Sequence, residues 1–236
     1  MRKILMVAMA LIMAIGSSFA QEKTQEELRK ENSKARQEIR KERQEIRKLS
    51  KKELRSRVDK SIRKDAKRLA KQGWLVKPGQ LSLEKQLERS YLMQCEYDED
   101  LFPKYIMGEA SSVGEHYDAA RTAALSLAIT NLAGQIQTEV TALVENTVAN
   151  KQLSADDAAS ISETVMTSKN LISQSIGRTI PVMECYRTNE KKNTEVLVRI
   201  AYNSEMARQS AKKALRAALE QKGDKLHEQL DLILGL

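Results

Sequence analysis

Residues 117–148 read YDAARTAALSLAITNLAGQIQTEVTALVENTV, and this stretch decides the fold. Its apolar residues recur at intervals of three and four, and it holds no proline and one interior glycine, Gly134. That period predicts a helix of about 30 residues, about 45 Å long. Small residues fill its first half, so we expect this helix to pack closely against a sheet or another helix.

The residues on either side predict the rest of the packed layer. A strand is expected over 104–111, and Ser154 opens a second helix with an S-x-x-D capping pattern, which makes an αα-hairpin. Residues 179–187 and 194–202 alternate with a period of two around a polar turn, as in a β-hairpin, and Ser204 starts a last helix. The order predicts an α+β fold: a small three-stranded sheet packed on one face by a long helix, an αα-hairpin and a C-terminal helix, preceded by a long basic N-terminal helix.

Composition divides the chain into five segments. We expect a signal peptide over 1–20, a basic, charged helical arm over 21–72, a linker over 73–81, an α+β body over 82–222 and an amphipathic tail over 223–236. The whole chain carries a formal net charge of +8. The arm holds 20 Lys and Arg residues against 10 Asp and Glu, so the basic charge is concentrated there.

The first twenty residues have the features of a secretory signal. Arg2 and Lys3 precede an apolar run over 4–15, and small residues lead to Ala20. The run is shorter than the roughly 20 residues that span a bilayer, which disfavours the alternative of an uncleaved anchor. Cleavage is predicted after Ala20. Because Gln21 rather than a cysteine follows, we expect an exported, periplasmic protein without a lipid anchor.

The arm contains a repeated heptad, RQEIRKE over 36–42 and RQEIRKL over 43–49. Clustered basic side chains attract anionic headgroups, so the arm is predicted to contact an anionic membrane surface or an envelope protein. The alternatives are a solvated spacer and a homo-oligomer formed through the N-terminal helix. An exported protein has no nucleic-acid partner. The candidate contact residues are Arg36, Arg40, Arg43, Arg47, Lys48, Lys51 and Lys52. An apolar stripe from Leu54 to Leu69 predicts that the end of the arm docks or pairs.

Several short motifs of the body occur together in one known family. They are GEAS at 108–111, Gly114, the alanine-rich stretch 119–124 and VLVRI at 196–200. With these, residues 104–218 resemble the lipoprotein-twenty-like family of Gram-negative envelope proteins. The resemblance implies an α+β domain, similar also to the N-terminal domain of a flagellar basal-body assembly protein, with an envelope role and no established enzymatic activity. Members commonly begin at a lipidated cysteine, which this chain lacks.

The sequence has few residues that could form a catalytic or metal-binding site. The chain has two cysteines and two histidines without metal-binding spacing, so no metal or cofactor is expected. Cys95 and Cys185 either pair as a disulfide in the exported protein or remain separate buried thiols. Glu109 and Arg121 are expected to face one another, and His116 to be a surface histidine. The sequence thus favours a non-enzymatic binding or structural module of the envelope; the alternatives are a module that binds peptidoglycan or the outer-membrane surface, and an exported enzyme.

Overall fold

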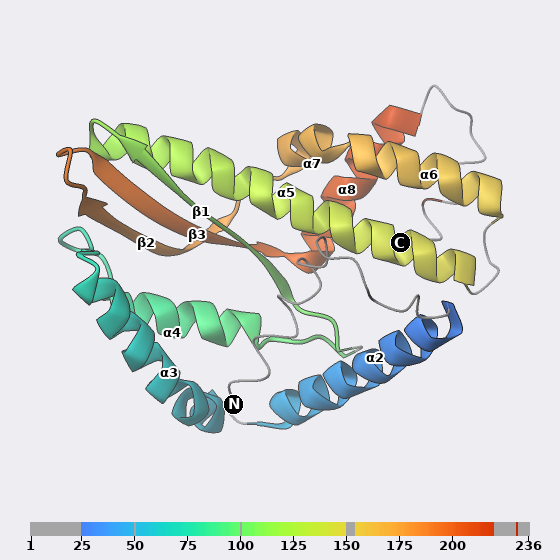
Figure 1. Ribbon diagram of the computed structural model, residues 1–236, viewed down its shortest axis with the longest axis horizontal. Helices are drawn as coiled ribbons and strands as arrows, with labels where there is room; N and C mark the ends of the chain where they lie inside the picture. The colour runs from blue at the N-terminus through green and yellow to red at the C-terminus, as the bar shows by residue number, and fades with distance from the viewer. Residues whose placement is uncertain (1–24, 50, 100, 150–153, 220–229, 231–236) are drawn as a thin grey trace, which may run out of the picture. The chain divides into compact units, whose positions relative to one another are not determined.

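The computed structural model describes residues 25–49, 51–99, 101–149, 154–219 and 230. It divides into two compact units, Met1–Glu42 and Arg43–Leu236. Of the first unit, the described part is the beginning of α2. The elements, in chain order, are α2 (Gln25–Lys48), α3 (Lys51–Lys71), α4 (Leu83–Gln94), β1 (Tyr105–Gly114), α5 (Tyr117–Ala149), α6 (Ala155–Thr167), α7 (Lys169–Ser175), β2 (Ile180–Thr188), β3 (Thr194–Asn203) and α8 (Ser204–Leu219), as Figure 1 shows.

The three strands form one antiparallel sheet in the order β1-β3-β2. Gly108 of β1 lies opposite Ile200 of β3, and Tyr186 of β2 lies opposite Val196. In the turn between β2 and β3, the Oδ1 atom of Asn189 accepts hydrogen bonds from two backbone N–H groups. The expected α+β class and the hairpin are confirmed.

One face of the sheet packs against α5. Val196, Val198, Ile200 and Tyr202 point toward this helix and share a buried cluster with its alanines and Leu132. The strand comes so close that a Cβ added at Gly108 would lie 2.4 Å from the carbonyl oxygen of Ala128. The small residues of α5 thus have the close-packing role that the sequence predicted, and Figure 1 shows the helix running along the strands.

The other face of the sheet is also covered, which corrects the expectation of helices on one face. Met183 and Cys185 of β2 share a second buried cluster with Trp74, Leu87 of α4 and Ile62 of α3. Leu197 of β3 packs against the same cluster. Both faces of the hairpin strands carry apolar residues, so a helical layer on each side is needed to bury them.

The end of the basic arm and the supposed linker belong to this second layer. Gly73, with φ +82°, ends α3, and the N–H of Trp74 bonds back to the carbonyl of Leu69. This turn places Trp74 in the core at 6% exposure, and Leu75 then pairs with Tyr186 along the outer edge of β2. Trp74 and Leu75 of the expected linker are therefore joined to the body, and α3 packs against it through Ile62.

The second helix of the predicted αα-hairpin is broken in two. Ser154 caps α6 as predicted, accepting the N–H of Asp157 at 3.2 Å. The helix ends at Thr167, where the side-chain amide of Gln137, on α5, donates to the carbonyls of Val165 and Met166 at 2.6 and 2.7 Å. A new helix, α7, starts at Lys169 and buries Ile172.

The C-terminal helix begins as predicted but with a different cap. The Oδ1 atom of Asn203 accepts the N–H groups of Glu205 and Met206, while the hydroxyl of Ser204 donates to the carbonyl of Pro103. The signal peptide over 1–20 lies outside the described residues, as does the tail over 223–236 except for the buried Leu230. In the described ranges, no helix has the length and apolar character needed to cross a membrane.

Candidate anionic-surface site

The helix α3 has two opposite faces of different character. Ile62 is 1% exposed, and Val58, Ala66 and Leu69 pack beside it against the second core cluster. On the opposite face, spacings of four, three and four align four exposed lysines over about 16 Å of helix. These four residues are here termed the lysine row: Lys60, Lys64, Lys67 and Lys71.

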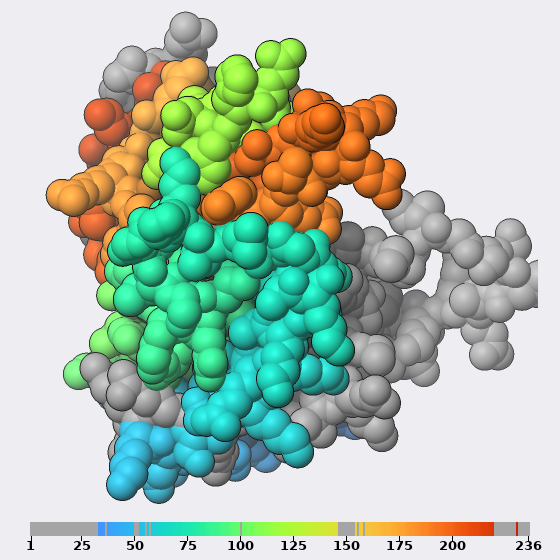
Figure 2. All heavy atoms as spheres, turned by 90° about the vertical axis from the view of Figure 1, so that its left-hand side faces the viewer, coloured from blue at the N-terminus to red at the C-terminus, as the bar shows by residue number. Residues whose placement is uncertain are grey.

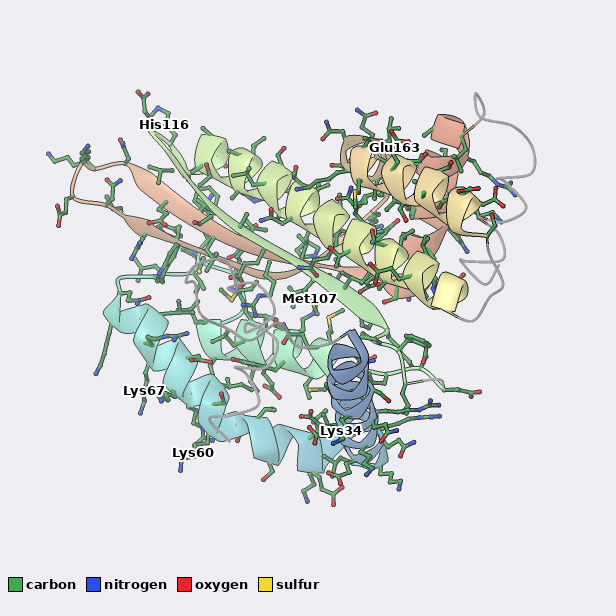
Figure 3. All side chains as sticks on the ribbon, turned by 45° about the vertical axis from the view of Figure 1, so that its right-hand side comes forward. Lys34, Lys60, Lys67, Met107, His116 and Glu163 are labelled. Carbon is green, nitrogen blue, oxygen red and sulfur yellow. The ribbon has the colours of Figure 1, made fainter. Side chains whose placement is uncertain are left out.

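The lysine row points away from the rest of its unit. Figure 3 shows Lys60 and Lys67 projecting outward from α3, on the side away from α4 and the sheet. In Figure 2 the side chains of α3, in cyan, stand at the surface beside the segment that follows it. Because Ile62 fixes the opposite face in the core, the helix cannot rotate to hide these charges.

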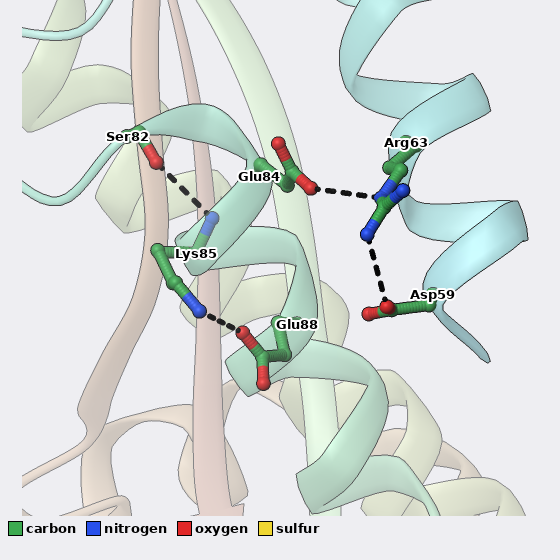
Figure 4. Close-up of polar contacts among 6 residues, drawn as sticks. All are labelled: Asp59, Arg63, Ser82, Glu84, Lys85 and Glu88. Carbon is green, nitrogen blue, oxygen red and sulfur yellow. Dashed lines mark hydrogen bonds and ion pairs between the residues drawn. The ribbon is translucent and has the colours of Figure 1, made fainter. Parts of the chain in front are cut away.

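Acidic residues near the row are held by arginines. Arg63 lies 3.2 Å from the Asp59 carboxylate and 3.5 Å from that of Glu84 on α4 (Figure 4). Arg68 likewise pairs with Asp65 at 3.2 Å. Such exposed pairs contribute little stability, about 0–1 kcal/mol. Their consequence is electrostatic: within the described ranges no carboxylate forms an ion pair with the four ammonium groups, so the face keeps its positive charge.

The structure gives two of the seven predicted contact residues, both arginines, an internal role. Arg43 donates from Nη1 to the carbonyl of Leu101 at 3.0 Å, and its guanidinium lies 5.4 Å from the ring centre of Tyr97. Arg47 donates to the carbonyl of Glu99 at 3.0 Å. These two side chains hold the loop before β1, where Leu101 is buried at a φ of +66°.

The other five predicted contact residues lie on α2 and at the start of α3. Arg40, Lys48 and Lys52 are exposed, whereas the side chains of Arg36 and Lys51 lie outside the described set. The lysine row was not among the predicted contact residues, although its signal is present in the sequence. The 4-3-4 spacing places the four lysines opposite the apolar stripe that includes Ile62.

A second polar cluster surrounds Glu184 on the edge strand β2. Its carboxylate accepts hydrogen bonds from Tyr117, from Arg121 at 2.9 Å and from Gln80 at 3.1 Å. Burial alone would raise the pKa of Glu184, but the bonds from Tyr117 and Gln80 and the charge of Arg121 outweigh it and lower that pKa. The cluster joins the 73–81 segment, α5 and β2, which is a structural role.

The expected pair of Glu109 and Arg121 does not form. Glu109 pairs instead with Arg199, its direct neighbour across the β1–β3 ladder. Glu109 and Arg199 lie on the side of the sheet that faces α4, because Arg199 also donates to Ser90 at 2.7 Å. Arg121 belongs to α5, which packs on the opposite side.

The cysteines and His116 lie in different environments. The structure contains both cysteines as thiols, with Cys185 buried and Cys95 half-buried. Burial and the Glu109 carboxylate raise the pKa of Cys185 to about 12. His116 is exposed in the turn between β1 and α5, and Figure 3 shows it at the tip of that turn. Oxidative pairing of the cysteines stays a prediction.

Comparison with known proteins reaches the N-terminal part of the chain. A protein family described as "Family of unknown function (DUF6520)" matches residues 1–53, which include the expected signal peptide, all of α2 and the first residues of α3. No curated protein and no solved structure matches the chain.

Proposed function

We propose that this protein is a non-enzymatic, exported component of the cell envelope that binds an anionic membrane surface through the lysine row of α3. The observation that carries the proposal is the geometry of that row. Four exposed lysines lie on one helix face, opposite a residue buried at 1% exposure, and the nearby acids are paired with arginines.

The predicted export and the positive charge of α3 favour a membrane surface of the envelope over a partner in the cytoplasm. A signal-like start at 1–20 directs the chain out of the cell, where phosphate-bearing headgroups are the abundant anions. The resemblance of residues 104–218 to the lipoprotein-twenty-like family also favours an envelope role.

The test is co-sedimentation of the mature protein with vesicles of phosphatidylglycerol and, separately, of phosphatidylcholine. We expect binding to the anionic vesicles alone and release as salt is raised, because the interaction is screened within a Debye length of about 8 Å at physiological ionic strength. Each lysine near the surface contributes about 1 kcal/mol. Changing all four lysines of the row to glutamine should therefore weaken binding by more than about a hundredfold at low salt.

A matched control separates the position of the charge from its amount. Lys104, Lys191, Lys192 and Lys213 are also exposed, and changing these four to glutamine removes the same charge from other places. This control variant should bind nearly as well as the wild type. Equal loss in both variants, or no binding by the wild type, would overturn the assignment to α3. Intact-mass measurement of the envelope protein should show an N-terminus at Gln21; a mass that includes Met1 would contradict the predicted export.

A further inference from the structure

A second site lies at the outer edge of β1. A pocket of about 520 Å³ is present there, within the roughly 300–1,000 Å³ typical of small-molecule sites. Its walls come from β1 itself, from the neighbouring strand β3, and from the end of α4, the middle of α5 and the start of α7. Met107, labelled in Figure 3, lies on the β1 wall. This edge pocket is separate from the lysine row.

Most of the charge around the edge pocket is internally balanced. The Arg199 guanidinium pairs with the Glu109 carboxylate and also donates to the hydroxyl of Ser90 at 2.7 Å. These bonds satisfy the pair and hold it in place. An incoming ligand would therefore meet a neutral ion pair on this wall rather than an available cation.

Lys169 supplies the unbalanced charge. It is half-buried and lies across Gly134, where an added Cβ would be 3.3 Å from its Cε atom and 3.4 Å from its Nζ atom. The glycine thus gives the lysine side chain room to lie against the backbone of α5. Among the residues that the structure describes, no acidic group pairs with this ammonium. The edge pocket consequently has a net positive charge of one, and favours an anion.

The remaining lining is rich in amides. Gln94 and Gln135 are exposed, and the amide of Asn131 donates to the outward carbonyl of Glu109 at 2.9 Å. A primary amide both donates and accepts, as a peptide group does. None of the lining residues is aromatic, so the pocket has no surface on which a sugar ring or a base would stack.

We propose that the edge pocket binds the C-terminal carboxylate of a short peptide, with the Lys169 ammonium as its counter-ion. The amides of Gln94 and Gln135 bond the peptide groups that precede the carboxylate. Capture of a terminal carboxylate beside the open edge of a sheet is a known mode of peptide recognition. This site is independent of the membrane contact proposed for α3.

The test uses N-acetyl-Ala-Ala as the probe, titrated into the full mature protein and followed by backbone NMR and calorimetry. We expect shifts confined to residues of the edge pocket, Gly134 and Gln135 among them. The same peptide with an amidated C-terminus should bind about tenfold more weakly or worse, because the charge-assisted bond is lost. Sodium glucuronate tests the other source of a carboxylate, and it should bind more weakly than the peptide because it cannot use the amides.

Substitutions test whether Lys169 supplies the positive charge that binds the carboxylate. Lys169→Met should lose binding to the same degree as amidation of the peptide, Lys169→Arg should keep part of it, and Lys191→Met, in the exposed turn between β2 and β3, should leave it unchanged. Thermal unfolding of each variant checks that it is folded, and Gln135→Ala gives a second reading should Lys169→Met unfold. Equal binding of acid and amide, unaltered binding by a folded Lys169→Met, or no shifts at millimolar peptide would overturn the proposal. Glucuronate binding as tightly as the peptide would overturn the peptide assignment.

Discussion

Gly108→Ala tests the packing of β1 against α5 directly. The added Cβ would lie 2.4 Å from the carbonyl oxygen of Ala128, and 3.0 Å from the Cβ of Leu132. The first of these atoms is helix backbone and cannot rotate away, so α5 must move by more than half an ångström. Overpacking of this kind costs about 1–3 kcal/mol, and the rigid neighbour favours the upper end.

A smaller effect opposes the clash. Alanine restricts the unfolded chain more than glycine, which stabilises the native state by about 0.4–1 kcal/mol. The expected net loss is therefore about 2 kcal/mol. For a domain of this size that corresponds to a fall in Tm of about 4–8 °C.

Urea unfolding followed by circular dichroism measures this loss, with Gly177→Ala as the control. At Gly177 the new Cβ would lie 3.7 Å from the hydroxyl of Tyr202, an ordinary contact, and the backbone N–H that donates to this hydroxyl is retained. Because the same restriction of the unfolded chain applies without a clash, the control should raise the free energy of unfolding by up to about 1 kcal/mol or leave it unchanged. If Gly108→Ala is as stable as the control, the close approach of α5 to β1 is wrong.

Three further predictions concern the layer beneath the sheet and its polar contacts. Removal of residues 21–42 should leave one cooperative unfolding transition, whereas removal of 21–72 should abolish it, because Ile62 and its neighbours are then lost from the core. Scanning calorimetry of both truncated proteins measures this. A cooperative transition in the protein that lacks 21–72 would contradict the assignment of α3 to the core. Glu184→Gln should be less stable than the wild type at pH 7, with the difference shrinking as pH falls below about 4.3, because a lowered carboxylate pKa stabilises the fold only while the group is ionised; a difference in Tm that does not depend on pH would refute this. Iodoacetamide at pH 8 should label Cys185 far more slowly in the native protein than in urea, because the thiolate is the reactive form and the raised pKa keeps this thiol protonated. If mass spectrometry under non-reducing conditions finds neither cysteine labelled in urea, the two cysteines form a disulfide instead.

The local pattern of the chain was sufficient to predict most of the elements. The 3.6-residue period over 117–148 predicted α5, and the two-residue period over 194–202 predicted β3, because each period is a property of the backbone geometry itself. Ser154 identified the start of α6 for the same reason: a cap needs only residues within one turn. The amphipathic pattern around Ile62 predicted that the end of the arm either docks or pairs, and the structure shows that it docks.

The tertiary structure alone decided where these elements pack and which charges remain exposed. The sheet is covered on both faces because Met183 and Cys185 need a layer that α3 and Trp74 provide, and no local signal joins segments so distant in sequence. Glu109 pairs with Arg199 rather than Arg121 because the register between β1 and β3 determines its neighbour. Repeated arginines on α2 look equivalent in the sequence, yet Arg43 and Arg47 hold a loop while the lysines of α3 face outward. Burial of one face of a helix fixes the direction of the other, and that orientation is set by the core as a whole.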